Sequence, residues 1–460
     1  MWRGQAQQRA DACDVVVVGA GLVGAAAAAR LAREGLDTAV LEAQTIAGGA
    51  TGRSAGMALT GLAGHYNWAV AAYGRQKARE AWALTVEGRQ RLVEAAEWLM
   101  VPVEHTGSLT LAVEEAEADA LKESAELLHE DGFDAWFGPS DPLGRGFHAA
   151  LRQPDDVTVD AAALVRALLA SSAVTVHERT PVVELEPGRG GVRVWAQGRT
   201  VLCSAVLLAI NGYAPLFSAY FAGKVAPVRS LAFLTPPLDA VVLKQPCSAD
   251  YGYAYCRQLP DRRLLLGGWR RPRSHPHPQP FPLGGGREEE EPDDALQERL
   301  VGFASRYFPE VDLHTLSHSP GETGLAPQTA GLWSGGSREA SVSRSSGETG
   351  LAPQTAGLWS GGSRGVSVSR STGEMGLAPQ AAGLWSGGSG KVSVSRSSGV
   401  MGLTPDGLPL VGVLPDLPRA YFAVGLGGRG LAWAFVVAER LVELMLHDAD
   451  PGLFSAVRLG

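Results

Sequence analysis

The most constraining feature of the sequence is a glycine-rich turn between an apolar run and a helix-forming segment near the start of the chain. Residues 14–18 read DVVVV, a short apolar run typical of a strand buried in a parallel sheet. The next six residues, GAGLVG, place Gly19, Gly21 and Gly24 in the G-x-G-x-x-G spacing. Residues 25–34 are rich in alanine and favour a helix. This order predicts a βαβ unit that binds a dinucleotide.

Each part of this unit has a physical task. The first glycine permits the tight turn, the second lets the backbone approach a pyrophosphate, and the third lets helix and strand pack closely. Phosphate then lies at the positive end of the helix that begins near Leu22. A second predicted strand, residues 38–41, ends at Glu42 and Ala43. A carboxylate there accepts hydrogen bonds from ribose hydroxyls and repels the 2′-phosphate of NADP.

Two further segments favour FAD over NAD. Residues 50–57 read ATGRSAGM, a loop of small residues whose backbone N–H groups can approach the pyrophosphate and the flavin ring. We call residues 50–57 the predicted flavin loop. Near the other end, a predicted strand at 421–424 leads into GLGGRG (425–430) and an apolar helix over 431–446. A helix N-terminus aimed at the flavin stabilises the negative charge of its reduced form. The predicted cofactor-binding residues in these segments are Thr51, Gly52, Arg53, Ser54, Ala55, Gly56, Met57, Gly427, Gly428, Arg429 and Gly430.

The remaining pattern predicts a mixed α/β (α+β) fold. Helices are expected over 75–100, 115–129, 160–170 and 294–307, and an antiparallel sheet over 226–269. We expect a Rossmann-like FAD-binding domain, discontinuous in sequence, with an inserted antiparallel-sheet substrate domain. The FAD-binding domain takes residues 14–70, 150–225 and 399–450, and the substrate domain takes residues 71–149 and 226–320.

A tandem repeat interrupts this fold. Gly321–Ser346, Gly347–Thr372 and Gly373–Ser398 are copies of one 26-residue unit, rich in Gly, Ser and Arg. Because the unit offers little apolar surface for stacking, we expect residues 321–398 to be a low-complexity, solvated and largely disordered insertion. Weak β-hairpins are one alternative. A partner-binding module is another, and it rests on one Trp in each copy, namely Trp333, Trp359 and Trp385.

Composition limits the classes of function. Of the 460 residues 45% are hydrophobic, and the formal net charge of −8 argues against nucleic acid or an anionic membrane surface as a partner. The four cysteines form no C-x-x-C pair, which indicates neither a zinc site nor a disulfide scaffold and fits a reducing compartment. The sequence has no secretory h-region and no apolar run long enough to span a bilayer. We therefore expect a soluble, cytoplasmic protein that holds no metal.

The motifs together resemble the D-amino-acid-oxidase-type flavoprotein family, which includes glycine, sarcosine and gamma-glutamylputrescine oxidases. The matching segments are VVVVGAGLVG, LEAQTIAGGATGRSAGM, ERTPVVELE, VLLAINGYAP, TPDGLPLVG and YFAVGLGGRGLAWA. GRSAG and TPDGLPLVG bring the chain nearest to the gamma-glutamylputrescine oxidase branch. The resemblance implies FAD, with Val182 at the adenine and Asn211 in the strand that closes the FAD site.

The resemblance also implies an activity. Hydride passes from the carbon of a C–N bond in an amine or amino acid to the flavin, the imine is hydrolysed, and oxygen becomes hydrogen peroxide. One alternative is a dehydrogenase that passes electrons to a quinone or a protein. Another is a non-catalytic flavoprotein scaffold that binds partners through its repeats.

Three departures from the family pattern bear on this reading. Sarcosine oxidases attach flavin through a cysteine at a position that falls near Gly399 here, so noncovalent FAD is expected. Some relatives place a lysine above the flavin, but residues 262–271, RRLLLGGWRR, contain none, which leaves the electron acceptor open. Relatives often carry Trp-x-Gly where this chain has Ser397-Ser398-Gly399.

The best candidate for a substrate wall is the segment YGYAYCRQ, residues 251–258. If it is one strand, alternation places Tyr251, Tyr253 and Tyr255 on one face, with Arg257 continuing it. The tyrosines could then frame an amine, and Arg257 could pair with a carboxylate. The alternative is an ordinary half-buried sheet face.

Two other residues are candidates for the substrate site. Arg270 ends the next predicted strand and could face the pocket. His65 follows the flavin loop and could cap the site, but a structural role is the favoured interpretation.

Overall fold

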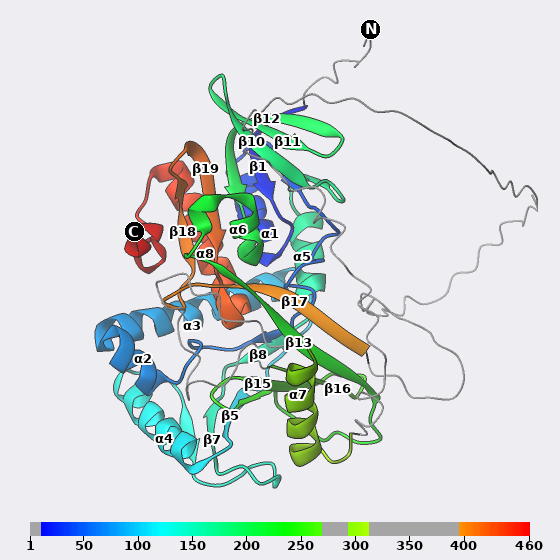
Figure 1. Ribbon diagram of the computed structural model, residues 1–460, viewed down its shortest axis with the longest axis vertical. Coiled ribbons are helices and arrows are strands. Elements are labelled where there is room, and N and C mark those ends of the chain that lie inside the picture. Colours follow the sequence, from blue (N-terminus) through cyan, green and yellow to red (C-terminus); the bar gives the residue numbers. More distant parts are fainter. Residues whose placement is uncertain (1–10, 269–292, 312–394) are drawn as a thin grey trace, which may run out of the picture. The chain divides into compact units, whose positions relative to one another are not determined.

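A computed structural model of the protein describes residues 11–268, 293–311 and 395–460 (Figure 1). Its first sheet has eight strands, six of them in the order β10-β11-β12-β1-β2-β9, while β19 pairs with β12 and β18 with β19. The strands are β1 (Asp11–Val18), β2 (Thr38–Leu41), β9 (Val174–His177), β10 (Val182–Gly188), β11 (Gly191–Ala196), β12 (Arg199–Leu208), β18 (Leu410–Leu414) and β19 (Leu417–Val424). The pairs β1–β2, β2–β9, β1–β12 and β12–β19 are parallel, as expected for a dinucleotide-binding sheet.

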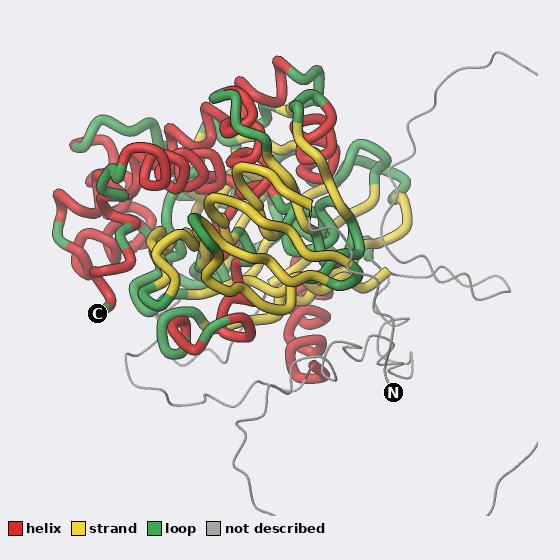
Figure 2. The backbone as a smooth tube through the Cα atoms, turned by 90° about the horizontal axis from the view of Figure 1, so that it is seen from above, coloured by secondary structure: helices red, strands yellow, loops and turns green. Residues whose placement is uncertain are grey.

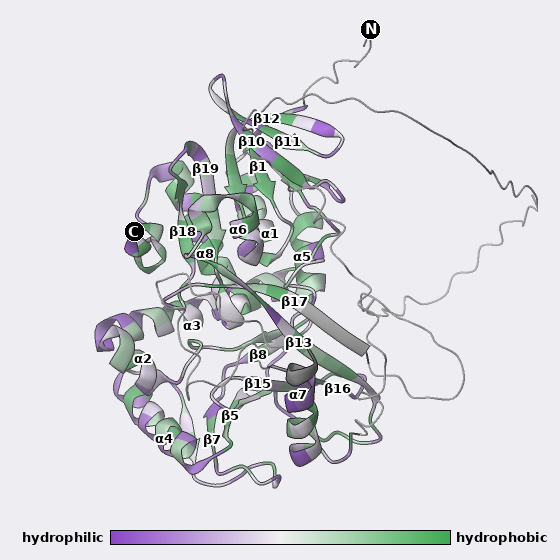
Figure 3. Cartoon of the chain, in the orientation of Figure 1, coloured by the Kyte–Doolittle hydropathy of each residue, from purple (hydrophilic) through white to green (hydrophobic). Residues whose placement is uncertain are grey.

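Apolar helices pack against this sheet. Helix α1 (Leu22–Arg33) contacts α5 (Ala161–Ala170) and α8 (Gly430–His447), and α8 contacts α3 (Arg75–Trp98). Figure 3 shows apolar residues along β1 and α8, in agreement with their burial. The helices α3 and α8 approach closely because Gly88 has no side chain: a Cβ there would lie 1.9 Å from the carbonyl oxygen of Ala432.

The second sheet has the strand order β17-β13-β16-β15-β14-β5-β7-β6. Its strands are β5 (Ser108–Ala112), β6 (Trp136–Gly138), β7 (Ala149–Gln153), β13 (Ala226–Pro237), β14 (Cys247–Ala249), β15 (Ala254–Gln258), β16 (Arg263–Gly268) and β17 (Ser395–Leu403). The expected antiparallel order holds except for β5 and β14, which run parallel and make the sheet a mixed one. Helix α7 (Asp293–Tyr307) packs on one face through Phe303 and Tyr307.

A small third sheet lies in the order β3-β8-β4 and follows directly from the predicted flavin loop. Its strands are β3 (Met57–Ala58), β4 (Val103–Glu104) and β8 (Val157–Val159). The other helices are α2 (Tyr66–Tyr73) and α4 (Glu115–Glu130), which contact each other, and the short α6 (Ala214–Phe217). Figure 2 shows the strands side by side with the helices against them. None of the helices in the described ranges is long and apolar enough to cross a membrane.

The last residues of the repeat array lie in a strand. Residues 321–394 lie outside the described residues, but the last four residues of the third copy, Ser395–Ser398, belong to β17. They pair antiparallel with Leu231–Leu234 of β13. Main-chain hydrogen bonding does not depend on apolar side chains, which is why a composition rich in Ser and Arg concealed the strand. Strand β17 of the second sheet therefore begins before Gly399.

Candidate functional site

The glycines of the first turn divide into two kinds. Gly19 has φ +103°, and a Cβ there would lie 2.7 Å from the carbonyl oxygen of Ala209. At Gly24 a Cβ would lie 2.0 Å from the carbonyl oxygen of Gly19, so helix and turn are in direct backbone contact. At Gly21 the nearest atom is only Thr51 Oγ1, at 3.3 Å. Gly19 and Gly24 are required by the fold, whereas Gly21 keeps the front of the turn open.

The N-terminus of α1 can hold an anion. Its N-cap is Gly21, which has no side chain of its own to cap the helix, and no acidic residue lies in the first turn. The backbone N–H of Leu22 donates to Thr51 Oγ1 at 3.1 Å, which brings the flavin loop against the helix end. Partial positive charge and N–H groups at a helix N-terminus suit a phosphate.

Glu42 is fixed beside this turn by two charge-assisted hydrogen bonds. The N–H of Ala20 donates to its Oε2 and the N–H of Gln44 to its Oε1, both at 2.8 Å. Ala43 is exposed beside it. Thr180 N–H donates to the Glu42 carbonyl at 2.8 Å, which brings the start of β10, with the buried Val182, to the same edge. These residues could receive the adenosine half of a dinucleotide.

The loop over residues 50–57 is held by hydrogen bonds to the residues just before it and within it. Gly52 N–H donates to the Ala47 carbonyl and Arg53 Nε to the Gly48 carbonyl, both at 3.0 Å. Ser54 Oγ donates to the Thr51 carbonyl at 2.8 Å. Met57 then enters β3 and pairs with Thr158 of β8. The loop is thus a defined turn between the helix end and the small sheet.

Asn211 holds the third segment of the site. Its Oδ1 accepts hydrogen bonds from the N–H groups of Gly425 and Leu426, at 3.0 and 3.1 Å. These two residues open GLGGRG, whose Gly427–Arg429 form a 3₁₀ turn before α8 begins at Gly430. Arg429 Nη1 lies 3.5 Å from the Thr60 carbonyl oxygen. The C-terminal turn therefore meets the chain just after the flavin loop.

A buried carboxylate that the sequence pattern did not reveal organises this meeting point. Asp156, 1% exposed, accepts hydrogen bonds from Thr60 N–H at 2.8 Å and from Ser108 Oγ at 2.6 Å. Burial raises the pKa of Asp156 above its usual value, although these hydrogen bonds and the Arg429 guanidinium act in the opposite direction. Asp156 lies 96 residues from Thr60 in sequence, so no local spacing could indicate the pair.

The predicted substrate strand over residues 251–258 is wrong in its first half. β14 ends at Ala249, and β15 begins only at Ala254. Asp250 and Tyr251 have φ +52° and +53°, so residues 250–253 form a turn that breaks the alternation. Tyr253 and Tyr251 are therefore buried turn residues, outside the β15 strand that carries Tyr255.

Tyr255 and Arg257 share the face of β15 that meets the flavin loop. The Tyr255 ring lies over Gly267, where a Cβ would come within 2.3 Å of it, and its hydroxyl is 3.4 Å from Ser230 Oγ. Arg257 Nη1 donates to the Ala55 carbonyl at 2.8 Å, and Nη2 forms an ion pair with Glu104, also at 2.8 Å. Both terminal nitrogens thus have partners within the protein, which argues against the expected pairing of Arg257 with a substrate carboxylate.

His65 lies in a buried polar cluster, which favours the structural role. Its Nε2 is 3.2 Å from Oε1 of Glu117, a carboxylate with no exposed surface. Glu117 also accepts the N–H groups of Val113 and Tyr251, so it ties α4 to the turn before β15. The rings of His65 and Tyr251 are 5.3 Å apart. The other candidate, Arg270, lies outside the described residues.

Comparison with known proteins decides the family. Residues 14–375 match the family of FAD dependent oxidoreductases (DAO). The protein belongs to this family. The cofactor of the family is FAD. The residues above fit it, since Gly21 leaves room for a pyrophosphate at the N-terminus of α1 and Glu42 offers a carboxylate beside the same turn. The expected flavoprotein family and mixed α/β fold are confirmed.

Individual relatives of the family are distant. The probable oxidoreductase OrdL of Haemophilus influenzae is 27% identical over 284 residues, 55% of this chain and 64% of the relative. Gamma-glutamylputrescine oxidoreductase of Escherichia coli is 25% identical over 283 residues, 56% of this chain and 64% of the relative. The chain thus spans somewhat less than two thirds of the length of these curated relatives.

Solved structures agree on the fold. Glycine oxidase from Geobacillus kaustophilus has a TM-score of 0.64 at 19% identity, with 97% of this chain and 98% of that chain covered. L-proline dehydrogenase from P. horikoshii has a TM-score of 0.61 at 17% identity, with 96% and 95% covered. At these identities the likeness establishes the DAO fold alone.

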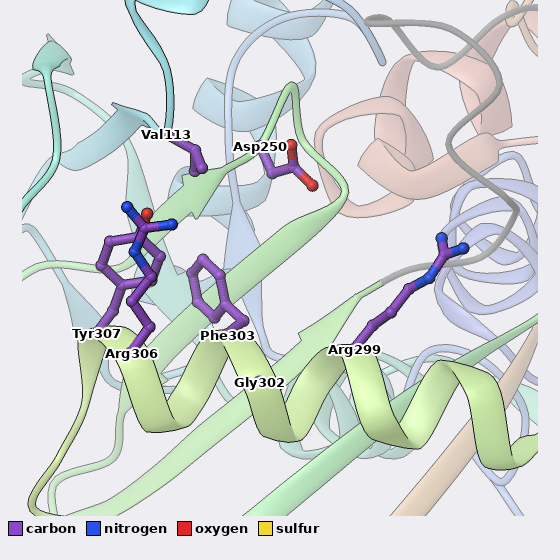
Figure 4. Close-up of a pocket in the computed structure, with 7 residues that line it drawn as sticks. All are labelled: Val113, Asp250, Arg299, Gly302, Phe303, Arg306 and Tyr307. Carbon is purple, nitrogen blue, oxygen red and sulfur yellow. The ribbon is translucent and has the colours of Figure 1, made fainter.

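A cavity of about 430 Å³ lies on α7. Figure 4 shows side chains of α7 below it, with Val113 and Asp250 opposite. Its lining residues are Val113, Asp250, Arg299, Gly302, Phe303, Arg306 and Tyr307. Cys256 belongs to the apolar cluster under α7, whereas its neighbours Tyr255 and Arg257 point the other way. The cavity is therefore not part of the candidate flavin site.

Proposed function

We propose that this protein is an FAD-dependent oxidase that takes a hydride from the carbon of a C–N bond in an amine or amino acid. One observation carries the proposal, namely that three predicted cofactor segments and the second sheet meet. Thr51 joins the loop over residues 50–57 to the glycine turn, Arg429 of the turn over residues 425–430 contacts Thr60 just after that loop, and Arg257 of the second sheet binds the loop at Ala55. Flavin, when bound, accepts the hydride and passes the electrons on.

The protein's own groups supply position and charge. The N–H groups at the start of α1 would hold the pyrophosphate, and Glu42 the ribose hydroxyls. The N-terminus of α8, behind Gly427–Arg429, would face the flavin and favour its reduced, anionic form. On the opposite side, the Tyr255 ring and hydroxyl offer a wall for the substrate amine. Orientation and exclusion of water are then the main contributions of the protein.

The flavin is proposed to be noncovalent. Gly399 packs on the flavin loop, where its Cβ position is 3.5 Å from Ala50 Cα and 3.6 Å from Arg53 Cβ, and glycine offers no group for attachment. The four cysteines all lie in strands, at Cys13, Cys203, Cys247 and Cys256, and three of them are buried. Precipitation with trichloroacetic acid should leave all yellow colour in the supernatant. A yellow pellet would show covalent flavin.

A dehydrogenase is the second candidate function. It is favoured by β16, whose six residues, Arg263–Gly268, include no lysine that could assist the reaction of flavin with oxygen. The hydride step is the same, and only the electron acceptor differs.

Anaerobic flavin bleaching tests both candidates. The holoprotein is mixed without oxygen with amines, N-methyl amino acids and D-amino acids, and loss of flavin absorbance reports hydride transfer. Admission of oxygen to the bleached protein should restore the colour rapidly and release hydrogen peroxide. Restoration only by a quinone would identify a dehydrogenase. Bound flavin that no substrate bleaches would contradict the proposal and leave the scaffold alternative.

A further inference from the structure

Arg257 is a buried cation at the junction of three elements. It stands on β15 of the second sheet and is 7% exposed. Nη1 donates to the carbonyl of Ala55 in the flavin loop, and Nη2 pairs with Glu104 of β4. Glu104 Oε2 also accepts the hydroxyl of Thr158 on β8. One guanidinium therefore connects the second sheet, the small sheet and the flavin loop.

The backbone of the loop rests directly on this guanidinium. Gly56 has φ +68°, and a Cβ there would lie 2.6 Å from Arg257 Nη1 and 2.2 Å from the carbonyl oxygen of Val159. On its other side the loop is tied down by Val159 N–H, which donates to the Gly56 carbonyl at 2.8 Å. The Ala55–Gly56 peptide is thus held between Arg257 and β8, with little freedom to shift.

The chemistry of arginine suits this position, because a planar fork can donate in two fixed directions at once. A lysine ammonium keeps the charge but lacks the fork. Arg257 Nε is buried and has no hydrogen-bond partner among the described residues, so the burial of this cation is not explained by complete satisfaction of its donors. The Glu104 side chain is 37% exposed and only partly offsets the charge.

We propose that Arg257 is a positioning residue for the cofactor. It fixes the Ala55–Gly56 peptide of the flavin loop for FAD binding, and its charge, balanced by Glu104, sets the reduction potential of the bound flavin. The inference rests on the proposed function in one respect, the assignment of residues 50–57 to the flavin. Removal of the cation disfavours the extra negative charge of reduced flavin and lowers the potential, whereas removal of the balancing carboxylate raises it.

Three variants separate position from charge. Arg257→Lys keeps the charge and loses the fork, so FAD affinity should fall by roughly ten-fold, the value of about one charge-assisted hydrogen bond, with the potential nearly unchanged. Arg257→Met should lower the affinity for FAD further and also lower the reduction potential of the bound flavin. Glu104→Gln keeps an acceptor for Nη2 and should raise the potential with little loss of affinity. Arg263→Met is the control. Arg263 pairs with Asp261, so its substitution removes the same charge from the second sheet without a change at the flavin loop.

The assay is titration of each apoprotein with FAD, followed by flavin fluorescence, together with the midpoint potential of the holoprotein against redox dyes. Opposite shifts of potential in Arg257→Met and Glu104→Gln support the proposal, since a purely structural role would not change the potential in opposite directions. Wild-type affinity and potential in all three variants, with lower melting temperatures, would overturn it. If Arg257→Met does not fold, Arg257→Lys and Glu104→Gln still decide. Wild-type protein that binds no FAD would instead refute the proposed function.

Discussion

A methyl group added at Gly21 should separate cofactor binding from folding. The backbone of Gly21 has φ −80° and ψ −177°, an extended conformation that alanine adopts freely. The new methyl would meet Thr51 Oγ1 at 3.3 Å and, among the described residues beyond its immediate chain neighbours, no other atom within 4 Å. Relief of this contact disturbs at most the hydrogen bond from Leu22 to Thr51, so the loss of stability should be about 1 kcal/mol or less.

The effect on FAD should be much larger. The methyl projects to the open side of the turn, where the pyrophosphate is expected to approach the backbone. Displacement of a charged phosphate oxygen from one N–H group costs about 1.5–3 kcal/mol. At about 1.4 kcal/mol for each factor of ten, FAD affinity should fall roughly ten- to a hundred-fold, and Gly21→Val should abolish FAD retention.

Gly24→Ala is the matched control, since it adds the same methyl group in the same turn. Its Cβ would lie 2.0 Å from the Gly19 carbonyl oxygen, a backbone clash that only a shift of α1 can relieve, at a cost of about 1–3 kcal/mol or more. We expect Gly21→Ala apoprotein to melt near the wild-type temperature and bind FAD weakly, and Gly24→Ala to melt well below it. Unchanged FAD affinity in Gly21→Ala would refute the assignment of the pyrophosphate to this turn.

Three other outcomes follow from the contacts. Glu42→Gln should lower the affinity for FAD in a titration, because both carboxylate oxygens accept N–H groups and the new amide nitrogen would face one of them. Equal dissociation constants of wild type and variant would argue against the ribose role of Glu42. Burial raises the pKa of Asp141, but several backbone N–H donors lower it more, so its pKa in the folded protein lies below the usual value of 3.8. The charged carboxylate therefore stabilises the fold above the unfolded pKa, and this stabilisation is lost as pH falls through the folded pKa. The stability gap between wild type and Asp141→Asn in urea should therefore close below about pH 4, and a constant gap would contradict this. Deletion of Gly321–Thr372, two whole repeats, keeps β17 intact and should leave FAD content and melting temperature close to those of wild type. Deletion of Gly321–Ser398 also removes four residues of β17 and should lower both quantities. Equal FAD content and melting temperature in the two deletion variants would show that those four residues contribute little.

The first βαβ unit could be predicted in detail because its signals are local. Apolar runs, glycine spacing and a helix-forming segment follow one another within 30 residues, and β1, α1 and β2 appear where these signals place them. The prediction of one strand over residues 251–258 was wrong because it also relied on a local pattern. Alternating tyrosines occur in a strand and in a turn alike, and only the positive φ of Asp250 and Tyr251 shows that this segment begins with a turn. The FAD-site residues and domain boundaries themselves remain predictions.

The buried charges around the flavin loop could not be predicted, because their partners are distant in sequence. Glu117 lies 52 residues from His65, Asp156 lies 96 from Thr60, and Arg257 lies 202 from Ala55. Each side chain on its own is an ordinary charged residue on a helix, a loop or a strand. Only the folded chain shows that all three reach the same stretch.

That stretch, residues 55–65, includes the end of the predicted flavin loop and the residues after it, and the three contacts connect it to the second sheet. Arg257 binds it from β15, Asp156 links it to Ser108 of β5, and Glu117 links it to the turn before β15. The three side chains are between 0% and 7% exposed, so each contact is costly to leave unpaired. Apolar packing alone would let the loop slide against the sheet, since it has no direction. Directional bonds at three points fix the loop relative to the sheet face that carries Tyr255. If the proposed function holds, these buried polar groups would set the distance between the flavin and the substrate wall.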